Sequence, residues 1–246
     1  MAEPDRPGVP GHMAVPVSPN WIAHINELRD AAPPDERVEL RRLADALRRV
    51  LGSMVRTDAP LDEVRAAVAG VEAVAERLGR YSSASLFEGY SEAATSGDPY
   101  AFFDHSPVMG RANPLAPPLE MWVDGDVVRG RARFGPAYEG PPDSVHGGYV
   151  AAVFDELLGT AQSLSGSPGM TARLTVDYRS PTPLEVDLRL EGRLVGVDGR
   201  KISTKGRLYA GDVLCAEAEG LFVTVDFARL AALVERRRAR REGSGP

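Results

Sequence analysis

The chain has 246 residues, 43% of them hydrophobic and 26% charged, a balance typical of a soluble globular protein with one large domain or two small ones. Its formal net charge of −6 argues against nucleic-acid binding over the whole surface, and no apolar run approaches the roughly 20 residues that cross a bilayer. Cys215 is the single cysteine, which excludes an internal disulfide. Because the N-terminus also lacks an apolar signal-peptide core, we expect a cytoplasmic location.

The N-terminal third is expected to form a lead-in and a helical hairpin. Residues 1–19 are rich in proline and poor in apolar residues, which predicts a disordered segment. Residues 35–55 repeat apolar side chains at helical spacing, with arginines on the other side. Asp58 is expected to cap a second helix that has Pro60 in its first turn. The apolar stripe of that helix consists of Leu61, Val64, Val68, Val71, Ala75 and Leu78.

We therefore predict a helical hairpin extension within residues 20–80. Its apolar faces must meet each other, the main domain or a second chain. A structural appendage is favoured over a regulatory or assembly role. A core without residues 1–80 is expected to fold by itself.

Residues 81–117 contain many glycines and prolines and predict an irregular linker or lid. His105 within it is expected to be a surface group. The extended runs 119–123 and 127–134 then flank Asp124-Gly125-Asp126, a combination that predicts a β-hairpin.

The segment from Tyr149 to Leu158 is apolar on nearly every side and predicts a buried helix. Asp155 and Glu156 interrupt it, and a carboxylate there is costly unless it is paired, hydrated or functional. We expect Glu156 to pair with an arginine or to reach solvent. Spacing in steps of three and four predicts that Asp155 lies in a furrow of small residues. The furrow comprises Gly148, Ala151, Ala152, Asp155, Gly159 and Gln162.

At the start of this helix, His146-Gly147-Gly148 presents an N-terminus without large side chains. Free N–H groups and the positive end of the helix dipole form a site for a carbonyl oxygen that gains negative charge. A plain turn at Gly147-Gly148, with Asp155 as a capped or surface group, remains the alternative, since short glycine motifs are weak evidence.

The rest of the chain alternates apolar and polar residues, as half-buried strands do. The clearest strand runs over 184–194, and tight turns then lead into 201–209 and 213–225. These strands predict an antiparallel meander whose apolar face is covered by the central helix. Residues 227–246 predict a last helix with a basic tail, which we expect to be solvated rather than bound to nucleic acid or lipid.

Metal and cofactor sites are not expected. The four histidines and one cysteine lack ligand spacing, and there is no nucleotide-binding loop of the Walker or dinucleotide type.

A long meander wrapped on one buried helix that is entered through His-Gly-Gly resembles the hotdog fold. More narrowly, the chain is similar to the PaaI-like acyl-CoA thioesterases, including their carboxyl-terminal modulator protein branch. The resemblance covers roughly residues 118–226 and implies an α+β hotdog thioesterase domain. The residues that carry it are Gly140-Pro141-Pro142, His146-Gly147-Gly148, Asp155, Thr171-Ala172, Leu174, Tyr178 and Pro181.

The resemblance also implies roles for individual residues. Asp155 falls at the position of the general base or nucleophile, and the N–H of Gly148 or Gly147 would polarise the thioester carbonyl. His146 would fix the turn, and Thr171 matches a hydroxyl that assists from the partner subunit. Gly147, Gly148 and Thr171 would contact the substrate. The asparagine that some members carry before His-Gly-Gly is missing here, which favours the branch with Gly-Pro-Pro.

Asp155 and the glycine turn lie on one helix about 10 to 14 Å apart, at about 1.5 Å per residue. This is too far for both to act on one carbonyl, so we expect a homodimer, or a dimer of dimers, with sites shared between subunits. The predicted activity is hydrolysis of acyl-CoA to a free acid and CoA. The alternatives are a non-catalytic acyl-ligand-binding or regulatory protein, and a dehydratase that uses His146 for proton transfer.

Overall fold

The computed structural model describes residues 25–26, 29–30, 32–81, 104–167 and 169–224. The expected lead-in over 1–19 and the last helix over 227–246 lie outside the described residues, as does most of the linker. The division of the chain into domains therefore stays a prediction.

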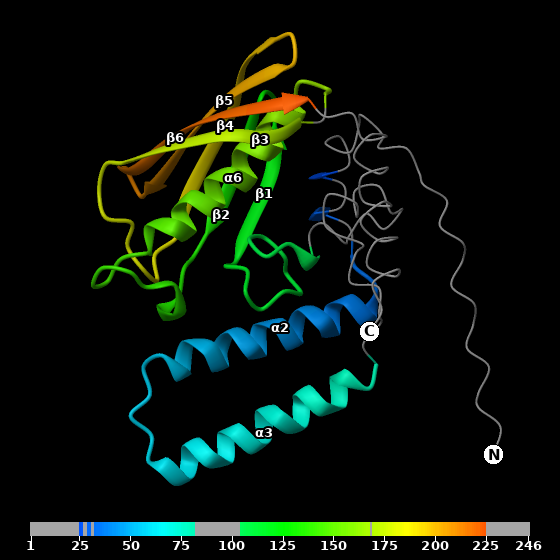
Figure 1. Cartoon of the computed structure of the whole chain (residues 1–246), viewed down its shortest axis with the longest axis vertical. Helices are drawn as coiled ribbons and strands as arrows, with labels where there is room; N and C mark the ends of the chain where they lie inside the picture. Colours follow the sequence, from blue (N-terminus) through cyan, green and yellow to red (C-terminus); the bar gives the residue numbers. More distant parts are fainter. Residues whose placement is uncertain (1–24, 27–28, 31, 82–103, 168, 225–246) are drawn as a thin grey trace, which may run out of the picture.

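The described residues form one antiparallel sheet with strand order β1-β2-β4-β5-β6-β3 and a central helix, α6, packed across it (Figure 1). This confirms the predicted α+β architecture of a sheet around one helix. The strands are β1 (Leu119–Asp124), β2 (Val127–Ala132), β3 (Gly169–Tyr178), β4 (Leu188–Asp198), β5 (Lys201–Ala210) and β6 (Val213–Thr224). The helices are α2 (Asp35–Met54), α3 (Leu61–Gly79), the short 3-10 helix η1 (Pro136–Tyr138) and α6 (Gly147–Ser163).

Tight turns connect β1 to β2 and join β4, β5 and β6 into the predicted meander. Gly125, Gly199 and Gly211 stand in these turns with φ of 62°, 55° and 57°, a left-handed conformation that glycine adopts without strain. The strand β3, which follows α6, pairs with β6 at the edge of the sheet.

The strand predicted from Leu184 begins four residues later, at Leu188. Glu185 has a positive φ of 57°, which breaks the extended backbone. The N–H groups of Leu184 and Glu185 donate to the carbonyls of Asp143 and Phe134 instead of joining the strand ladder.

The core forms where α6 crosses the sheet. A Cβ at Gly192 or Gly206 would come within 3.0 Å of a leucine on α6, so glycine at these two strand positions lets the helix approach closely. The buried residues of this layer include Val150, Val153, Phe154, Leu157, Leu158, Leu190, Ile202, Leu208 and Phe222.

The two predicted N-terminal helices are present, but the predicted cap of the second one is wrong. Pro60 is the N-cap of α3, and no side chain caps this helix. The extended backbone of Pro60 lets the helix begin at Leu61, two residues later than a cap at Asp58 would place it. Asp62 and Glu63 in the first turn supply the negative charge expected from Asp58.

Ion pairs attach α2 to the segment that precedes β1. Asp104 is 1% exposed and accepts bonds from Arg37 at 2.7 Å and from Arg41 at 2.6 Å. Arg48 donates to the backbone carbonyls of Gly110, Asn113 and Ala116 and so holds the following segment. These contacts argue against the expectation that the core folds without residues 1–80.

Candidate active site

The turn before α6 is fixed by backbone hydrogen bonds. The N–H of His146 donates to the carbonyl of Tyr138, and the N–H of Gly140 donates to the carbonyl of Ser144. Both donor–acceptor distances are 2.9 Å. A Cβ at Gly140 would lie 2.7 Å from the Cα of His146, which explains a glycine at this position. The segment from Tyr138 to Ser144 thereby sets the residue at which α6 begins.

His146 is the N-cap of α6, and its Nδ1 accepts the N–H of Gly148 at 3.0 Å. The N–H groups of Tyr149 and Val150 donate to the carbonyl of His146. The N–H of Gly147, in contrast, has no acceptor among the residues that the structure describes. Of the two glycines proposed to polarise a carbonyl, Gly147 is therefore the one whose N–H is available.

Tyr178 supports the same turn from the edge strand β3. Its hydroxyl donates to the carbonyl of Gly147 at 2.8 Å, and its ring would lie 3.3 Å from a Cβ on that glycine. The sequence placed Tyr178 on a strand and gave it no role at the site. The long-range pairing of β3 with β6 brings it there.

Asp155 is exposed on α6, in the furrow of small residues, and its Oδ1 accepts the hydroxyl of Thr171 at 2.8 Å. Thr171 belongs to β3 of the same chain as the Asp155 that it contacts, and the expectation that its hydroxyl assists the site from the partner subunit stays a prediction. Gln162, predicted to lie in the furrow, is instead 4% exposed and lies against Gly169. The furrow thus closes after Gly159.

Asp155 and Gly147 are not brought together within one chain. They lie eight residues apart on α6, which at about 1.5 Å per residue separates them by about 12 Å along the axis. A helix is rigid over this length, so a single α6 presents the acid and the free N–H as two separate half-sites.

Glu156 has a different environment from its neighbour. It is half-buried, and its Oε1 accepts the hydroxyl of Ser106 at 2.8 Å. Of the two expected environments it keeps partial exposure to solvent, and it forms no ion pair with an arginine in the described part of the chain. Burial raises the pKa of Glu156; the bond from Ser106 opposes this, and the charge of Asp155 adds to it. Ser106 also accepts the N–H groups of Val108 and Met109. Sequence reasoning missed Ser106, although the turn-forming Ser106-Pro107 pair was a signal.

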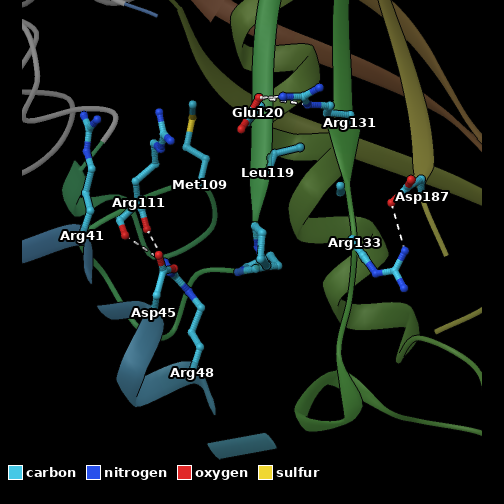
Figure 2. A pocket seen from close by; sticks show the side chains of 14 residues that line it. Arg41, Asp45, Arg48, Met109, Arg111, Leu119, Glu120, Arg131, Arg133 and Asp187 are labelled. Atoms are coloured by element: carbon cyan, nitrogen blue, oxygen red, sulfur yellow. Dashed lines mark hydrogen bonds and ion pairs between the residues drawn. The ribbon is translucent and has the colours of Figure 1, made fainter. Parts of the chain in front are cut away.

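Two pockets bear on where a ligand could bind. A cleft of about 430 Å³ between α2 and the β1–β2 hairpin is lined by arginines, as Figure 2 shows, and contains none of the predicted catalytic residues. Its guanidinium groups are largely engaged, as in the pairs Arg131–Glu120 and Arg133–Asp187. We regard this cleft as a structural interface rather than a site.

The second hollow, of about 480 Å³, is more apolar and lies beside the first turn of α6. Tyr138 and Tyr149 form part of its wall, with ring centroids 4.8 Å apart. Burial raises the pKa of Tyr138 to about 12, partly offset by Arg48, so its hydroxyl stays protonated and donates to Ala116. Its apolar lining also includes Leu51, Gly52, Val55, Leu115, Phe134, Pro136 and Ala137, and Arg48, Arg49, Arg133 and Glu185 are its charged lining residues.

Comparison with known proteins points to one family. The model of the thioesterase superfamily matches residues 143–217. A crystal structure of a thioesterase superfamily protein is 36% identical with a TM-score of 0.67, and the match covers 75% of this chain and 94% of that protein.

Curated proteins named acyl-coenzyme A thioesterase THEM4 are similar as well. The one from Xenopus laevis is 36% identical over 91 residues and the one from Bos taurus is 34% identical over 94 residues. These matches cover 36% and 37% of this chain, and 41% and 38% of the two relatives. The chain thus spans about two fifths of the length of these curated relatives.

Within the described residues, none of the helices combines the length and apolar character that a membrane span requires.

Proposed function

The chain belongs to the thioesterase superfamily, and from this we propose that it hydrolyses an acyl-CoA thioester to a free acid and CoA. The observation that carries the proposal is the exposed furrow of α6. The furrow holds a carboxylate, Asp155, fixed by Thr171, and follows directly on a helix N-terminus with the available N–H of Gly147. The names of the similar THEM4 proteins support the same substrate class.

Each site in this proposal is shared by two subunits. Because α6 holds Asp155 and Gly147 about 12 Å apart, the acid of one subunit acts on a carbonyl bound at the glycine turn of the other. Two antiparallel α6 helices related by a twofold axis give two equivalent sites. The assembly is a homodimer or a dimer of dimers.

Asp155 activates the attacking group. As a general base it takes a proton from water, which attacks the thioester carbonyl. As a nucleophile it attacks the carbonyl itself and forms a mixed anhydride, which water then hydrolyses to release the acid and regenerate the carboxylate. Thr171 occupies Oδ1, so Oδ2 is the oxygen that acts in the reaction. The N–H of Gly147 and the positive end of α6 stabilise the oxyanion, and CoA leaves as a thiolate that is then protonated.

The apolar hollow beside Tyr149 suits the acyl chain. It adjoins the first turn of α6, and its volume of about 480 Å³ falls in the range of small-molecule sites. Each methylene that enters it contributes about 0.8 kcal/mol, so kcat/KM should rise about fourfold per added carbon until the hollow is full.

A binding protein without catalysis and a dehydratase are the competing functions. Dehydration would use His146 for proton transfer, but its Nδ1 is already engaged as the cap of α6. This favours a structural role for His146. The Gly140-Pro141-Pro142 segment supports placement among the PaaI-like thioesterases, in their branch with Gly-Pro-Pro, and the single cysteine supports a cytoplasmic location.

The decisive experiment incubates the full chain with saturated and 3-hydroxy acyl-CoAs of increasing chain length. Thiol release that depends on chain length is the expected result. Tight binding without thiol release would identify a binding protein. Formation of an enoyl-CoA from the 3-hydroxy substrates would identify a dehydratase.

A further inference from the structure

The outer helix α3 carries an apolar stripe that nothing in the described part of the chain covers. The stripe, which we term the α3 seam, repeats in steps of three and four residues, the spacing of a coiled-coil interface. Its five larger side chains are 39% to 62% exposed, and α3 has no buried residue. In Figure 1, α3 lies beyond α2, away from the sheet and α6. The α3 seam consists of Leu61, Val64, Val68, Val71, Ala75 and Leu78.

A helix of 19 residues gains most of its stability from packing of its apolar face, so an uncovered seam indicates a missing partner. The neighbouring α2 does not supply it, since its own Leu40, Val50 and Met54 are exposed as well. We propose that the α3 seam pairs with the same seam of a second copy of this chain, as an antiparallel two-stranded coiled coil about a twofold axis. This inference is independent of the proposed function.

The antiparallel register gives a seam that complements itself. Leu61 meets the partner's Leu78, Val64 meets the partner's Ala75, and Val68 meets the partner's Val71. Each of these three residue pairs occurs twice, once on either side of the twofold axis, as an interface between identical surfaces requires. The seam is therefore closed along its whole length without any unmatched apolar residue.

Charges beside the seam select this orientation. Arg65 and Glu72 are exposed and form no ion pair within the described residues. In the antiparallel register, Arg65 faces the partner's Glu72 on one flank, while Ala67 faces the partner's Val74 on the other. In the parallel register, Arg65 would face Pro60 and Glu72 would face Ala67, leaving both charges unmatched. Since flanking residues set orientation in coiled coils, the antiparallel pair is favoured.

The pairing uses a different surface from the shared site. None of the α3 seam residues lines the furrow of α6 or contacts Asp155, Thr171 or Gly147 in the described structure. A chain with both interfaces has one contact through α3 and a second through α6.

Disulfide trapping in the full chain tests the orientation. The native Cys215 is buried and does not compete. Leu61→Cys with Leu78→Cys in one chain should give covalent dimers on oxidation. Leu61→Cys alone should not, because the two new thiols lie 17 residues, or about 25 Å, apart along the antiparallel pair. Dimers formed by the single variant as readily as by the double one would overturn the antiparallel register, and no dimers from the double variant would overturn the pairing.

Sedimentation of the full chain tests whether a second copy of the chain covers the α3 seam. Val68→Glu with Val71→Glu should halve the particle mass, whereas the control Ala66→Glu with Ala73→Glu, on the opposite face of α3, should leave it unchanged. Arg65→Glu should weaken association, and added Glu72→Arg should restore it. An unchanged mass with a lower melting temperature in the seam variant, together with no covalent dimer from the double cysteine variant, would mean that another segment of the same chain covers the seam, which contradicts the proposal.

Discussion

At the residue scale, two adjacent carboxylates of α6 differ because of what they touch. Asp155 is exposed and held by a threonine hydroxyl, whereas Glu156 is half-buried against Ser106. One residue along a helix is a turn of about 100°, so the two side chains face different surroundings. This difference supports the proposal that Asp155 carries the chemistry and that Glu156 has a structural role.

We expect Asp155→Asn to lower kcat about 10²- to 10⁴-fold, the contribution of a general base, without changing the melting temperature. Steady-state hydrolysis of an acyl-CoA with thiol detection measures the effect. Asp177→Asn, an exposed acid on the neighbouring strand β3, is the matched control and should retain full activity. Wild-type rates in Asp155→Asn would exclude this residue as the base.

Glu156→Gln should lower activity less than tenfold and should stabilise the protein at neutral pH. Because burial raises the pKa of Glu156, the folded chain holds this proton more tightly than the unfolded chain. The resulting stability is present below the unfolded pKa and is lost as the pH rises through the folded pKa. Calorimetry should show a higher melting temperature than wild type at about pH 8 and no difference near about pH 4. An activity loss above tenfold would reverse the roles of the two acids.

At the element scale, ion pairs and hydrogen bonds connect α2 to the segment that precedes β1. Its arginines neutralise Asp104, a buried carboxylate of the segment that also carries Ser106 and so reaches Glu156 on α6. A chain of polar contacts therefore links α2 to the helix that bears the site.

Replacing Arg37 and Arg41 together by alanine leaves Asp104 buried without a cation. Loss of the partner of a buried charge costs about 3–5 kcal/mol, which urea unfolding should detect. Arg42→Ala, which breaks an exposed pair with Glu39 on the same helix, should cost at most about 1 kcal/mol.

By the same reasoning, deletion of residues 1–80 should give unfolded or insoluble protein; a soluble, cooperative fragment would contradict this.

At the scale of the whole molecule, the shared site predicts complementation between two inactive variants. Gly147→Pro removes the available N–H at the first helical position, where proline is tolerated. Gly147→Ala keeps the N–H and controls for contact with Tyr178. In a mixed dimer, one subunit carries Asp155→Asn and the other carries Gly147→Pro. Because each site takes its acid from one subunit and its glycine turn from the other, one site contains both changes and the other contains neither.

Activity should therefore return on co-refolding to about half of wild type per mixed dimer, by counting sites under twofold symmetry. Labelled subunits confirm that mixed dimers form. If such dimers stay inactive, each subunit must complete its own chemistry.

The sequence by itself determined the features that depend on neighbours along the chain. Alternation located the strands, helical spacing located α2, α3 and α6, and aspartate-glycine pairs located the turns. His146-Gly147-Gly148 and Asp155 were also visible, because a helix N-terminus and a carboxylate in an apolar helix are local signals.

Only the tertiary structure decided which distant groups meet. The pairing of β3 with β6 brings Thr171 to Asp155 and Tyr178 to Gly147, and the positive φ of Glu185 delays the start of β4. The burial of Asp104 depends on a helix more than 60 residues away. Local patterns record backbone preference and burial, whereas the choice among distant hydrogen-bond partners is made by packing of the whole chain.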